Sequence, residues 1–173
     1  MIKRKPVIGV MGSGTEAYDD LCGMVARLIY AKNCHLLTGG GMGCMESVSK
    51  AFVECKCASN EGGICIGVVP VGKEGYPNKY VELVIRSPLG VYAGDDPTQI
   101  SRNHINVMTS DIIIALPGSK GTKNEIDIAS RMDKPLILFG PSERFKDFPI
   151  NLDRAENIQQ VETFVDKHLN LGQ

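Results

Sequence analysis

Three glycine-rich turns contain the residues of this chain that are best suited to bind an anion. The first is Gly12-Ser13-Gly14, the second runs from Gly39 to Gly43, and the third from Pro117 to Thr122. Each turn lies between an apolar run and a segment with helical spacing, so its backbone N–H groups would converge at the positive end of a helix. We expect the phosphate of a ligand to be bound by Gly12, Ser13, Gly39, Gly40, Gly41, Met42, Gly43, Pro117, Gly118, Ser119, Lys120, Gly121 and Thr122.

Two charged residues near the third turn could act on such a ligand. Glu125 lies three residues after the turn, so it could either cap the helix, as in an S/T-x-x-E box, or carry out chemistry. Arg102 precedes Glu125 by 23 positions and could be a solvated surface charge or a ligand contact. We interpret His104 as a helix-surface residue, whereas Tyr76 and Tyr92 could stack on a base.

The first turn also fits the dinucleotide pattern G-x-G-x-x-G/A, over residues 12–17. That fingerprint needs a carboxylate about 20 residues further on, at the end of the second strand, where this chain has Leu36-Leu37-Thr38-Gly39. A nicotinamide or flavin oxidoreductase is therefore not expected, and a purely structural role explains Ser13 as well as a phosphate contact does. No Gly-Lys-Ser/Thr follows, which excludes a P-loop ATPase, and the scattered histidines indicate no metal site.

The composition argues against several other classes of protein. The 173 residues include 19 Lys and Arg and 20 Asp and Glu, and no segment combines basic with aromatic residues, so a nucleic-acid partner is not expected. No apolar run approaches the ~18 residues of a membrane span, which indicates a soluble, cytoplasmic protein without a membrane partner. Six cysteines without a C-x-x-C pair predict reduced, partly buried thiols.

Apolar runs alternate with segments of helical spacing along the whole chain. The runs predict strands over residues 7–11, 35–38, 64–69, 80–85, 111–116 and 135–139. The helical segments cover residues 16–32, 45–57, 97–108, 123–132 and 157–169. This order predicts a single doubly wound α/β domain over residues 1–173, Rossmann-like, with a mostly parallel sheet and helices on both faces. Its strand ends would bring the three turns to one edge.

The third turn and its surroundings resemble a known family. Residues 117–125 are similar to the P-G-G-x-G-T-x-x-E signature of the Lonely Guy (LOG) phosphoribohydrolases, often mislabelled as lysine decarboxylases, and Arg102 and Asp111 match at the family's spacing. The resemblance extends from Gly12 to about Gly140 and includes the related molybdenum cofactor carrier proteins. It implies a homodimer or a larger homo-oligomer.

Three positions depart from the LOG pattern. Ser119 replaces the second glycine of the signature, Asn124 replaces the acidic residue before Glu125, and Asn103 replaces the lysine after the arginine. The Arg-Asn pair is more similar to the carrier proteins, although those proteins often lose the signature that is nearly intact here. The sequence therefore lies between the two branches.

The two branches imply different functions. LOG enzymes hydrolyse the N-glycosidic bond of a purine nucleoside 5′-monophosphate, so the first hypothesis is cleavage of AMP or an N6-substituted AMP to base and ribose 5-phosphate, without a cofactor. Glu125 would stabilise the oxocarbenium-like sugar, Arg102 would contact the nucleotide or keep Glu125 ionised, and Asn103 would join the nucleotide-binding residues. The carrier branch implies a protein that binds the molybdenum cofactor without cleaving it. A nucleotide sensor is the third alternative.

Overall fold

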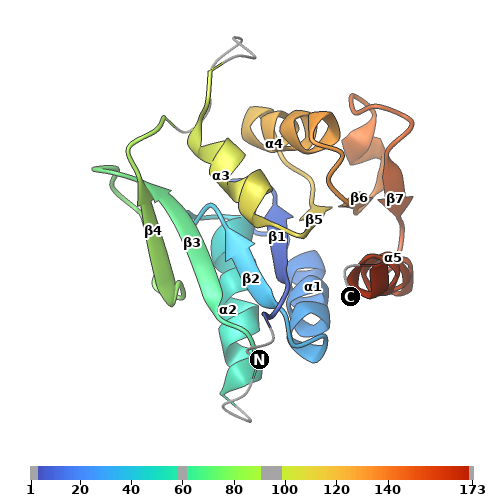
Figure 1. Cartoon of the computed structure of the whole chain (residues 1–173), viewed down its shortest axis with the longest axis horizontal. Coiled ribbons are helices and arrows are strands. Elements are labelled where there is room, and N and C mark those ends of the chain that lie inside the picture. The colour runs from blue at the N-terminus through green and yellow to red at the C-terminus, as the bar shows by residue number, and fades with distance from the viewer. Residues whose placement is uncertain (1–3, 58–61, 91–98, 172–173) are drawn as a thin grey trace.

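A computed structural model describes residues 4–57, 62–90 and 99–171 of the chain (Figure 1). Its centre is a seven-stranded sheet in which all neighbouring strands are parallel. The strands are β1 (Val7–Met11), β2 (His35–Thr38), β3 (Cys65–Pro70), β4 (Leu83–Ser87), β5 (Ile112–Ala115), β6 (Leu136–Phe139) and β7 (Asp153–Ala155). Their spatial order is β4-β3-β2-β1-β5-β6-β7, so the chain reverses its winding direction between β1 and β5.

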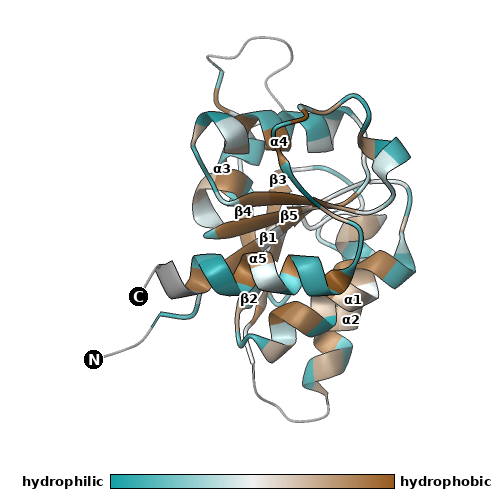
Figure 2. Cartoon of the chain, turned by 90° about the vertical axis from the view of Figure 1, so that its right-hand side faces the viewer, coloured by the Kyte–Doolittle hydropathy of each residue, from teal (hydrophilic) through white to brown (hydrophobic). Residues whose placement is uncertain are grey.

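In the described part of the chain, five α-helices cover the two faces of the sheet (Figures 1 and 2). They are α1 (Asp19–Ala31), α2 (Cys44–Lys56), α3 (Arg102–Thr109), α4 (Lys120–Arg131) and α5 (Ile158–Leu171). Helices α1, α2 and α5 contribute to one hydrophobic cluster, and α3 and α4 contribute to the other. The predicted doubly wound α/β architecture is therefore confirmed. Among the described residues, no helix is long and apolar enough to cross a membrane.

The central strands are apolar at every position because both of their faces are covered. In β5, Ile112 and Ile114 join the cluster under α1, α2 and α5, whereas Ile113 and Ala115 join the cluster under α3 and α4. Successive strand side chains point to opposite faces, so a strand between two helical layers needs an apolar residue at each position. Figure 2 shows these strands as a hydrophobic layer between helices with polar outer surfaces.

Several element boundaries differ from the prediction. Strand β4 covers residues 83–87 rather than 80–85, and most of its side chains are partly or fully exposed because it is an edge strand. Strand β7 was not predicted, since Asp153 and Arg154 are exposed and only Ala155 is buried. The short 3-10 helix η1 (Ser142–Phe145) was also not predicted. Short, polar elements of this kind lack the apolar run that reveals a strand.

Three helix starts differ for local reasons. Helix α1 begins at Asp19 because the Ser13 hydroxyl accepts the N–H groups of Thr15 and Glu16 and holds that segment as a turn. Helix α3 begins at Arg102 rather than at 97, after the N-cap residue Ser101. Residues 97 and 98 lie outside the described part of the chain, as does Tyr92. Helix α4 begins at Lys120, three residues earlier than predicted, so its first turn includes the last three residues of the third glycine-rich turn.

Candidate functional site

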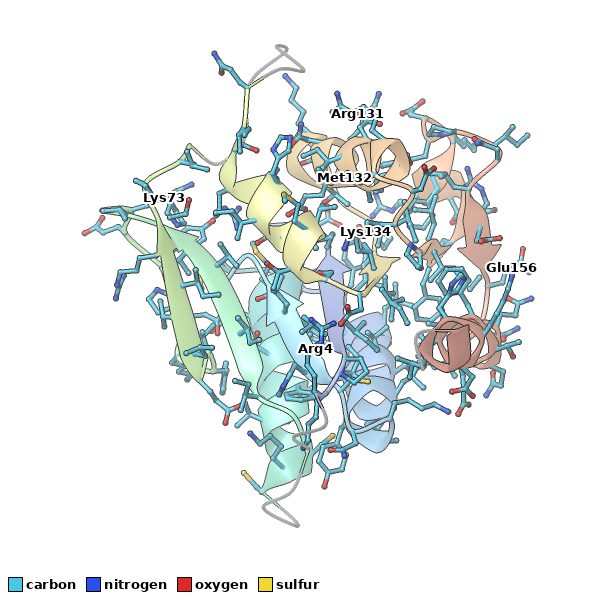
Figure 3. All side chains as sticks on the ribbon, in the orientation of Figure 1. Arg4, Lys73, Arg131, Met132, Lys134 and Glu156 are labelled. Atoms are coloured by element: carbon cyan, nitrogen blue, oxygen red, sulfur yellow. The ribbon has the colours of Figure 1, made fainter. Side chains whose placement is uncertain are left out.

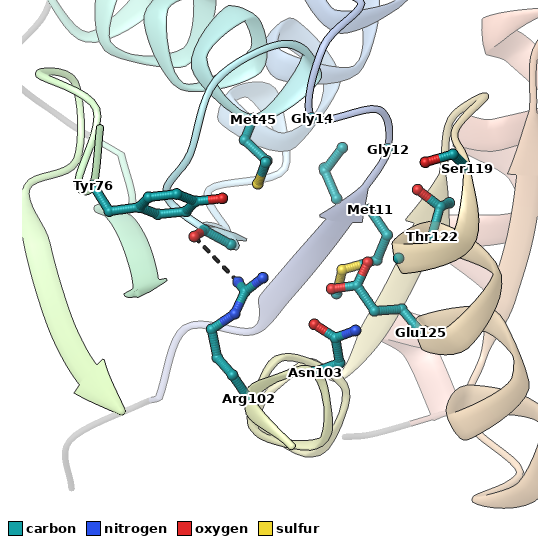
Figure 4. A pocket seen from close by; sticks show the side chains of 13 residues that line it. Met11, Gly12, Gly14, Met45, Tyr76, Arg102, Asn103, Ser119, Thr122 and Glu125 are labelled. Carbon is teal, nitrogen blue, oxygen red and sulfur yellow. Dashed lines mark hydrogen bonds between the residues drawn. The ribbon is translucent and has the colours of Figure 1, made fainter. Parts of the chain in front are cut away.

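A pocket of about 170 Å³ opens at the carboxyl end of β1, between α3 on one side and α4 on the other (Figure 4). This is the point at which the strand order reverses, where doubly wound sheets bind their ligands. The pocket is lined by Val10, Met11, Gly12, Gly14, Gly39, Met45, Tyr76, Arg102, Asn103, Ser119, Gly121, Thr122 and Glu125. The three predicted turns therefore meet at one edge of the sheet, and each contributes to the pocket.

The start of α4 is the part of the pocket best suited to an anion. Its N-cap residue Ser119 makes no side-chain hydrogen bond to the helix, and its first turn contains no acidic residue. A Cβ atom added at Gly121 would meet no atom within 4 Å, so open space lies beside the backbone there. The positive end of the helix dipole and the N–H groups of the first turn are therefore available to a negatively charged group.

Glu125 lies on the same helix, one turn further on, with its carboxyl group in the pocket. Its Oε1 atom accepts a 2.8 Å hydrogen bond from Nδ2 of Asn106, a residue of α3. Glu125 therefore does not cap α4, and this alternative from the sequence is wrong. Burial raises the pKa of the Glu125 carboxyl, although the Asn106 hydrogen bond and the Arg102 charge act in the opposite direction.

Arg102 is buried, with 4% of its surface exposed, and is not the solvated charge that the sequence left open. Its Nη1 atom donates to the carbonyl oxygens of Gly39, at 3.2 Å, and Val68, at 2.9 Å (Figure 4). Among the described residues, no carboxylate lies within ion-pairing distance of its guanidinium group. Arg102 therefore does not form the ion pair with Glu125 that the sequence allowed, although its charge lowers the pKa of Glu125 against the larger, opposite effect of burial.

The two asparagines that depart from the LOG pattern contact each other. Asn103 on α3 donates from Nδ2 to Oδ1 of Asn124 on α4, at 2.9 Å. A neutral amide pair thus joins the two helices at the positions for which the LOG resemblance implies a lysine and an acidic residue. The two departures are therefore paired in space, and Asn103 also lines the pocket.

The first turn lines the pocket with its two glycines, while Ser13 makes hydrogen bonds that hold the turns together. Gly12 and Gly14 line the pocket, but the Ser13 side chain is used within its own turn, where its hydroxyl accepts two backbone N–H groups. The Ser13 backbone also donates to the carbonyl of Pro117, at 3.0 Å, and accepts from Cys44, at 2.9 Å. Ser13 therefore connects the three turns, and the structural interpretation holds for its side chain.

The second turn is largely filled by protein groups. Gly39 lines the pocket, but the carbonyls of Gly40 and Gly41 accept hydrogen bonds from the backbone N–H and side-chain amide of Asn78, at 2.7 and 2.8 Å. Met42 is 48% exposed and faces a separate hollow, which Gly43 also lines. Residues 40–43 are therefore outside the pocket, contrary to the prediction.

In the third turn, three predicted residues likewise lie outside the pocket lining. The carbonyl of Pro117 accepts from Ser13, Gly118 packs against the Thr122 side chain, and Lys120 is exposed. The residues that the sequence predicted and the pocket brings together are Gly12, Gly39, Arg102, Asn103, Ser119, Gly121, Thr122 and Glu125.

Sequence reasoning missed most of the apolar lining and all of the polar support behind it. Val10, Met11 and Met45 are part of ordinary strand and helix patterns, so no signal separates them from core residues. Asn106 had a detectable signal, since it lies four residues after Arg102 and so on the same face of α3. Tyr76, weighed as a stacking residue, does line the pocket.

Other candidate residues have structural roles. His104 accepts the Ser101 N–H at 3.0 Å and completes a capping box. Asp111 lies at the amino end of β5, where it accepts the Val7 N–H at 2.8 Å and pairs with Arg4, which Figure 3 labels. It is not among the residues that line the pocket. All six cysteines are free thiols and four are buried, as predicted. Burial raises the pKa of Cys34 and Cys65 to about 11.

Comparisons with known proteins agree with this arrangement. The family model of the SLOG cluster4 family matches residues 5–167. An uncharacterized protein of Archaeoglobus fulgidus is 31% identical over 137 residues, which cover 78% of this chain and 80% of that protein. The structure of the molybdenum cofactor binding protein from Rippkaea orientalis is 30% identical, with a TM-score of 0.77 and coverage of 97% and 99% of the two chains. The molybdenum cofactor carrier protein from Chlamydomonas reinhardtii is 25% identical, with a TM-score of 0.74 and coverage of 96% and 99%.

Proposed function

Since the chain belongs to the SLOG cluster4 family, we propose that it binds the molybdenum cofactor, a phosphorylated pterin, in the pocket between α3 and α4 without cleaving it. The phosphate would lie at the start of α4, against the backbone N–H groups of Gly121 and Thr122. The pterin ring would lie toward Arg102 and Asn103. Two solved structures similar over nearly the whole chain belong to proteins named for binding or carrying this cofactor, which supports the proposal.

The observation that carries the proposal is a pair of unused polar atoms on the α3 side. Nε of Arg102 and Oδ1 of Asn103 are buried and have no hydrogen-bond partner among the described residues. Buried polar atoms without partners are rare in folded proteins, and a bound ligand is one explanation for them. One atom is a donor and the other an acceptor, which together suit the ring edge of a pterin, with its N–H and C=O groups.

The state of Glu125 favours binding over cleavage. Breaking a glycosidic bond requires negative charge or a poised water beside an oxocarbenium-like sugar. Here burial raises the pKa of the carboxyl, and Oε1 is already hydrogen-bonded to Asn106. Burial thus disfavours the anionic catalyst that the LOG resemblance implies, although the hydrogen bond from Asn106 acts on the pKa in the opposite direction.

Hydrolysis of a purine nucleoside 5′-monophosphate is the second candidate. It is favoured by one observation, that Arg102, Thr122 and Glu125 line the same pocket. In that case the phosphate of AMP would occupy the same place at α4. Glu125 would protonate the departing base, because a raised pKa makes a carboxyl better suited to act as a general acid.

One pair of assays separates the two candidates. The purified chain is incubated anaerobically with isolated molybdenum cofactor and passed through a desalting column, and in parallel it is incubated with AMP while free adenine is measured. We expect the cofactor to remain with the protein and no adenine to be released. Release of adenine by the wild type and not by Glu125→Gln would instead establish the hydrolase.

A further inference from the structure

Asn106 lies behind the pocket and contacts Glu125 with only half of its amide group. The side chain is fully buried, and its Nδ2 atom donates to Oε1 of Glu125 at 2.8 Å. Its Oδ1 atom is also buried and has no hydrogen-bond partner among the described residues. The amide nitrogen of Asn106 is thus hydrogen-bonded to the carboxyl group, but the amide oxygen is not. One more proton, placed between the carboxyl group and this oxygen, would complete a second hydrogen bond between the two side chains.

We propose that Glu125 carries that proton, so that Glu125 and Asn106 form a closed acid–amide pair. Oε1 of Glu125 accepts from Nδ2 of Asn106, and the protonated Oε2 donates to Oδ1. Both polar atoms of the amide are then satisfied without a buried negative charge. Asn106 is thus a positioning residue, because it fixes the protonation state and orientation of Glu125 without lining the pocket.

The surroundings of Glu125 support the neutral form. Glu125 is 7% exposed, and the residues that line the pocket with it include Met11 on β1 and Thr122 on α4, which carry no charge. From α3, Arg102 is the charged side chain that acts on it. Lys120 and Lys123 on α4 are exposed, and burial is the dominant influence, which raises the pKa.

A neutral Glu125 makes the pocket more positive, and the effect of this on ligand binding rests on the proposed function. With Glu125 neutral, the Arg102 guanidinium and the positive end of α4 face the ligand without an opposing charge. An ionised Glu125 would place a negative charge beside a bound phosphate and weaken its binding. The binding of an anion should therefore be linked to the proton on Glu125.

The first experiment titrates Glu125 in the ligand-free protein. Glutamate side chains are labelled with ¹³C at the carboxyl carbon, and their chemical shifts are followed as the pH rises. We expect one signal, absent from the Glu125→Gln spectrum, to ionise at a higher pH than all other glutamates. A Glu125 signal that ionises together with the others would overturn the proposal.

The second experiment measures the binding of sulfate by calorimetry at several pH values. Sulfate mimics phosphate but stays a dianion throughout, so its own titration does not contribute. We expect its affinity for the wild type to fall about tenfold as Glu125 ionises, and its affinity for Glu125→Gln to stay constant over the same range. Equal pH dependence in both proteins would contradict the proposed link. Absence of sulfate binding at every pH would count against the proposed function, while the carboxyl titration still decides the protonation of Glu125.

A third comparison isolates the role of Asn106. The bond from Nδ2 of Asn106 alone lowers the pKa of Glu125, whereas the proposed second bond, from Oε2 to Oδ1, exists only in the acid form and outweighs it. Asn106→Leu removes both bonds, so under the proposal Glu125 should ionise at a lower pH than in the wild type. Asn124→Ala is the matched control, since it breaks a different amide bond between α3 and α4 and should leave the Glu125 titration unchanged. If Asn106→Leu instead raised the pKa of Glu125, Asn106 would be an ordinary donor to a carboxylate, and the acid–amide pair would be excluded.

Discussion

The second and third turns are both rich in glycine, but Gly39 and Gly41 in the second turn and Gly121 in the third use the missing side chain in opposite ways. In the second turn, an added Cβ atom would lie 2.3 Å from the Arg102 guanidinium at Gly39 and 2.7 Å from the Tyr76 ring at Gly41. In the third turn, an added Cβ atom at Gly121 would meet nothing within 4 Å. Glycine in the second turn makes room for the protein's own side chains, whereas Gly121 leaves room for a ligand.

This difference shows that a glycine-rich turn at a strand end does not by itself indicate a ligand site. Such a turn brings the backbone close to something, but the sequence of the turn does not say whether that neighbour is a phosphate or another part of the chain. Here Asn78 and Tyr76, both from the loop after β3, occupy the neighbourhood of the second turn. The start of α4 remains the proposed anion site.

Substitution of Gly43 should have the largest effect on stability. Its φ of 62° disfavours any other residue, and a Cβ atom would lie 2.5–2.7 Å from the backbone of residues 13–15. Gly43→Ala should lower the free energy of unfolding by about 2–4 kcal/mol, measured by urea unfolding. Gly72→Ala is the matched control, because its φ of 72° is similar but no atom lies near the added Cβ. Equal losses in the two variants would show that the second turn is not crowded.

Arg102→Met should affect both stability and binding. The carbonyls of Gly39 and Val68 would lose their hydrogen bonds from Nη1, which should cost about 2 kcal/mol of unfolding free energy. The same variant should fail to retain the molybdenum cofactor on a desalting column. Arg131→Met, which changes an exposed arginine on α4, should retain it. Normal retention by Arg102→Met would remove Arg102 from the site.

Glu125→Gln should stabilise the protein in a pH-dependent way. The folded-state pKa of Glu125 is raised from 4.5, so the folded wild type loses stability as the pH rises from that value through the folded-state pKa. Glutamine carries no ionisable proton and avoids this loss. The variant should therefore be more stable than the wild type by about 1 kcal/mol at the upper end of this range, with the difference disappearing toward lower pH. Urea unfolding at a series of pH values measures this difference, and a constant difference would contradict the raised pKa.

Gly121→Ala should have the smallest effect on stability and a clear effect on binding. Alanine favours a helical position over glycine, so the free energy of unfolding should rise by at most about 1 kcal/mol. The added methyl group would fill the open space beside the start of α4 and weaken sulfate binding about tenfold, as measured by calorimetry. Undiminished binding would place the anion elsewhere and would remove the contrast between the two turns.

Much of the fold could be predicted from the sequence because buried parallel strands leave continuous apolar runs. The runs at Val7–Met11 and Ile112–Ala115 identify the two central strands, and the glycines after the strands locate the ligand edge. Strand β7 could not be predicted, because its Asp153 and Arg154 side chains face solvent.

The sequence predicted which turns form the site, but not which of their atoms are free to contact a ligand. The meeting of Gly12, Gly39 and Gly121 follows from parallel strand ends, which the alternating pattern predicts. The carbonyls of Gly40 and Gly41 accept hydrogen bonds from Asn78, and the sequence could not show this because Asn78 is a loop residue with no recognisable spacing. The partner of Glu125 depends on how α3 packs against α4, and local sequence spacing carries no information about that packing.

The most direct test of the central claim is a crystal structure of the chain with the molybdenum cofactor bound. The account predicts that the phosphate lies against the backbone N–H groups of Gly121 and Thr122, with the ring edge hydrogen-bonded to Nε of Arg102 and Oδ1 of Asn103. A cofactor bound instead in the outer hollow beside Met42, Glu46 and Lys50, with the pocket between α3 and α4 left empty, would contradict it.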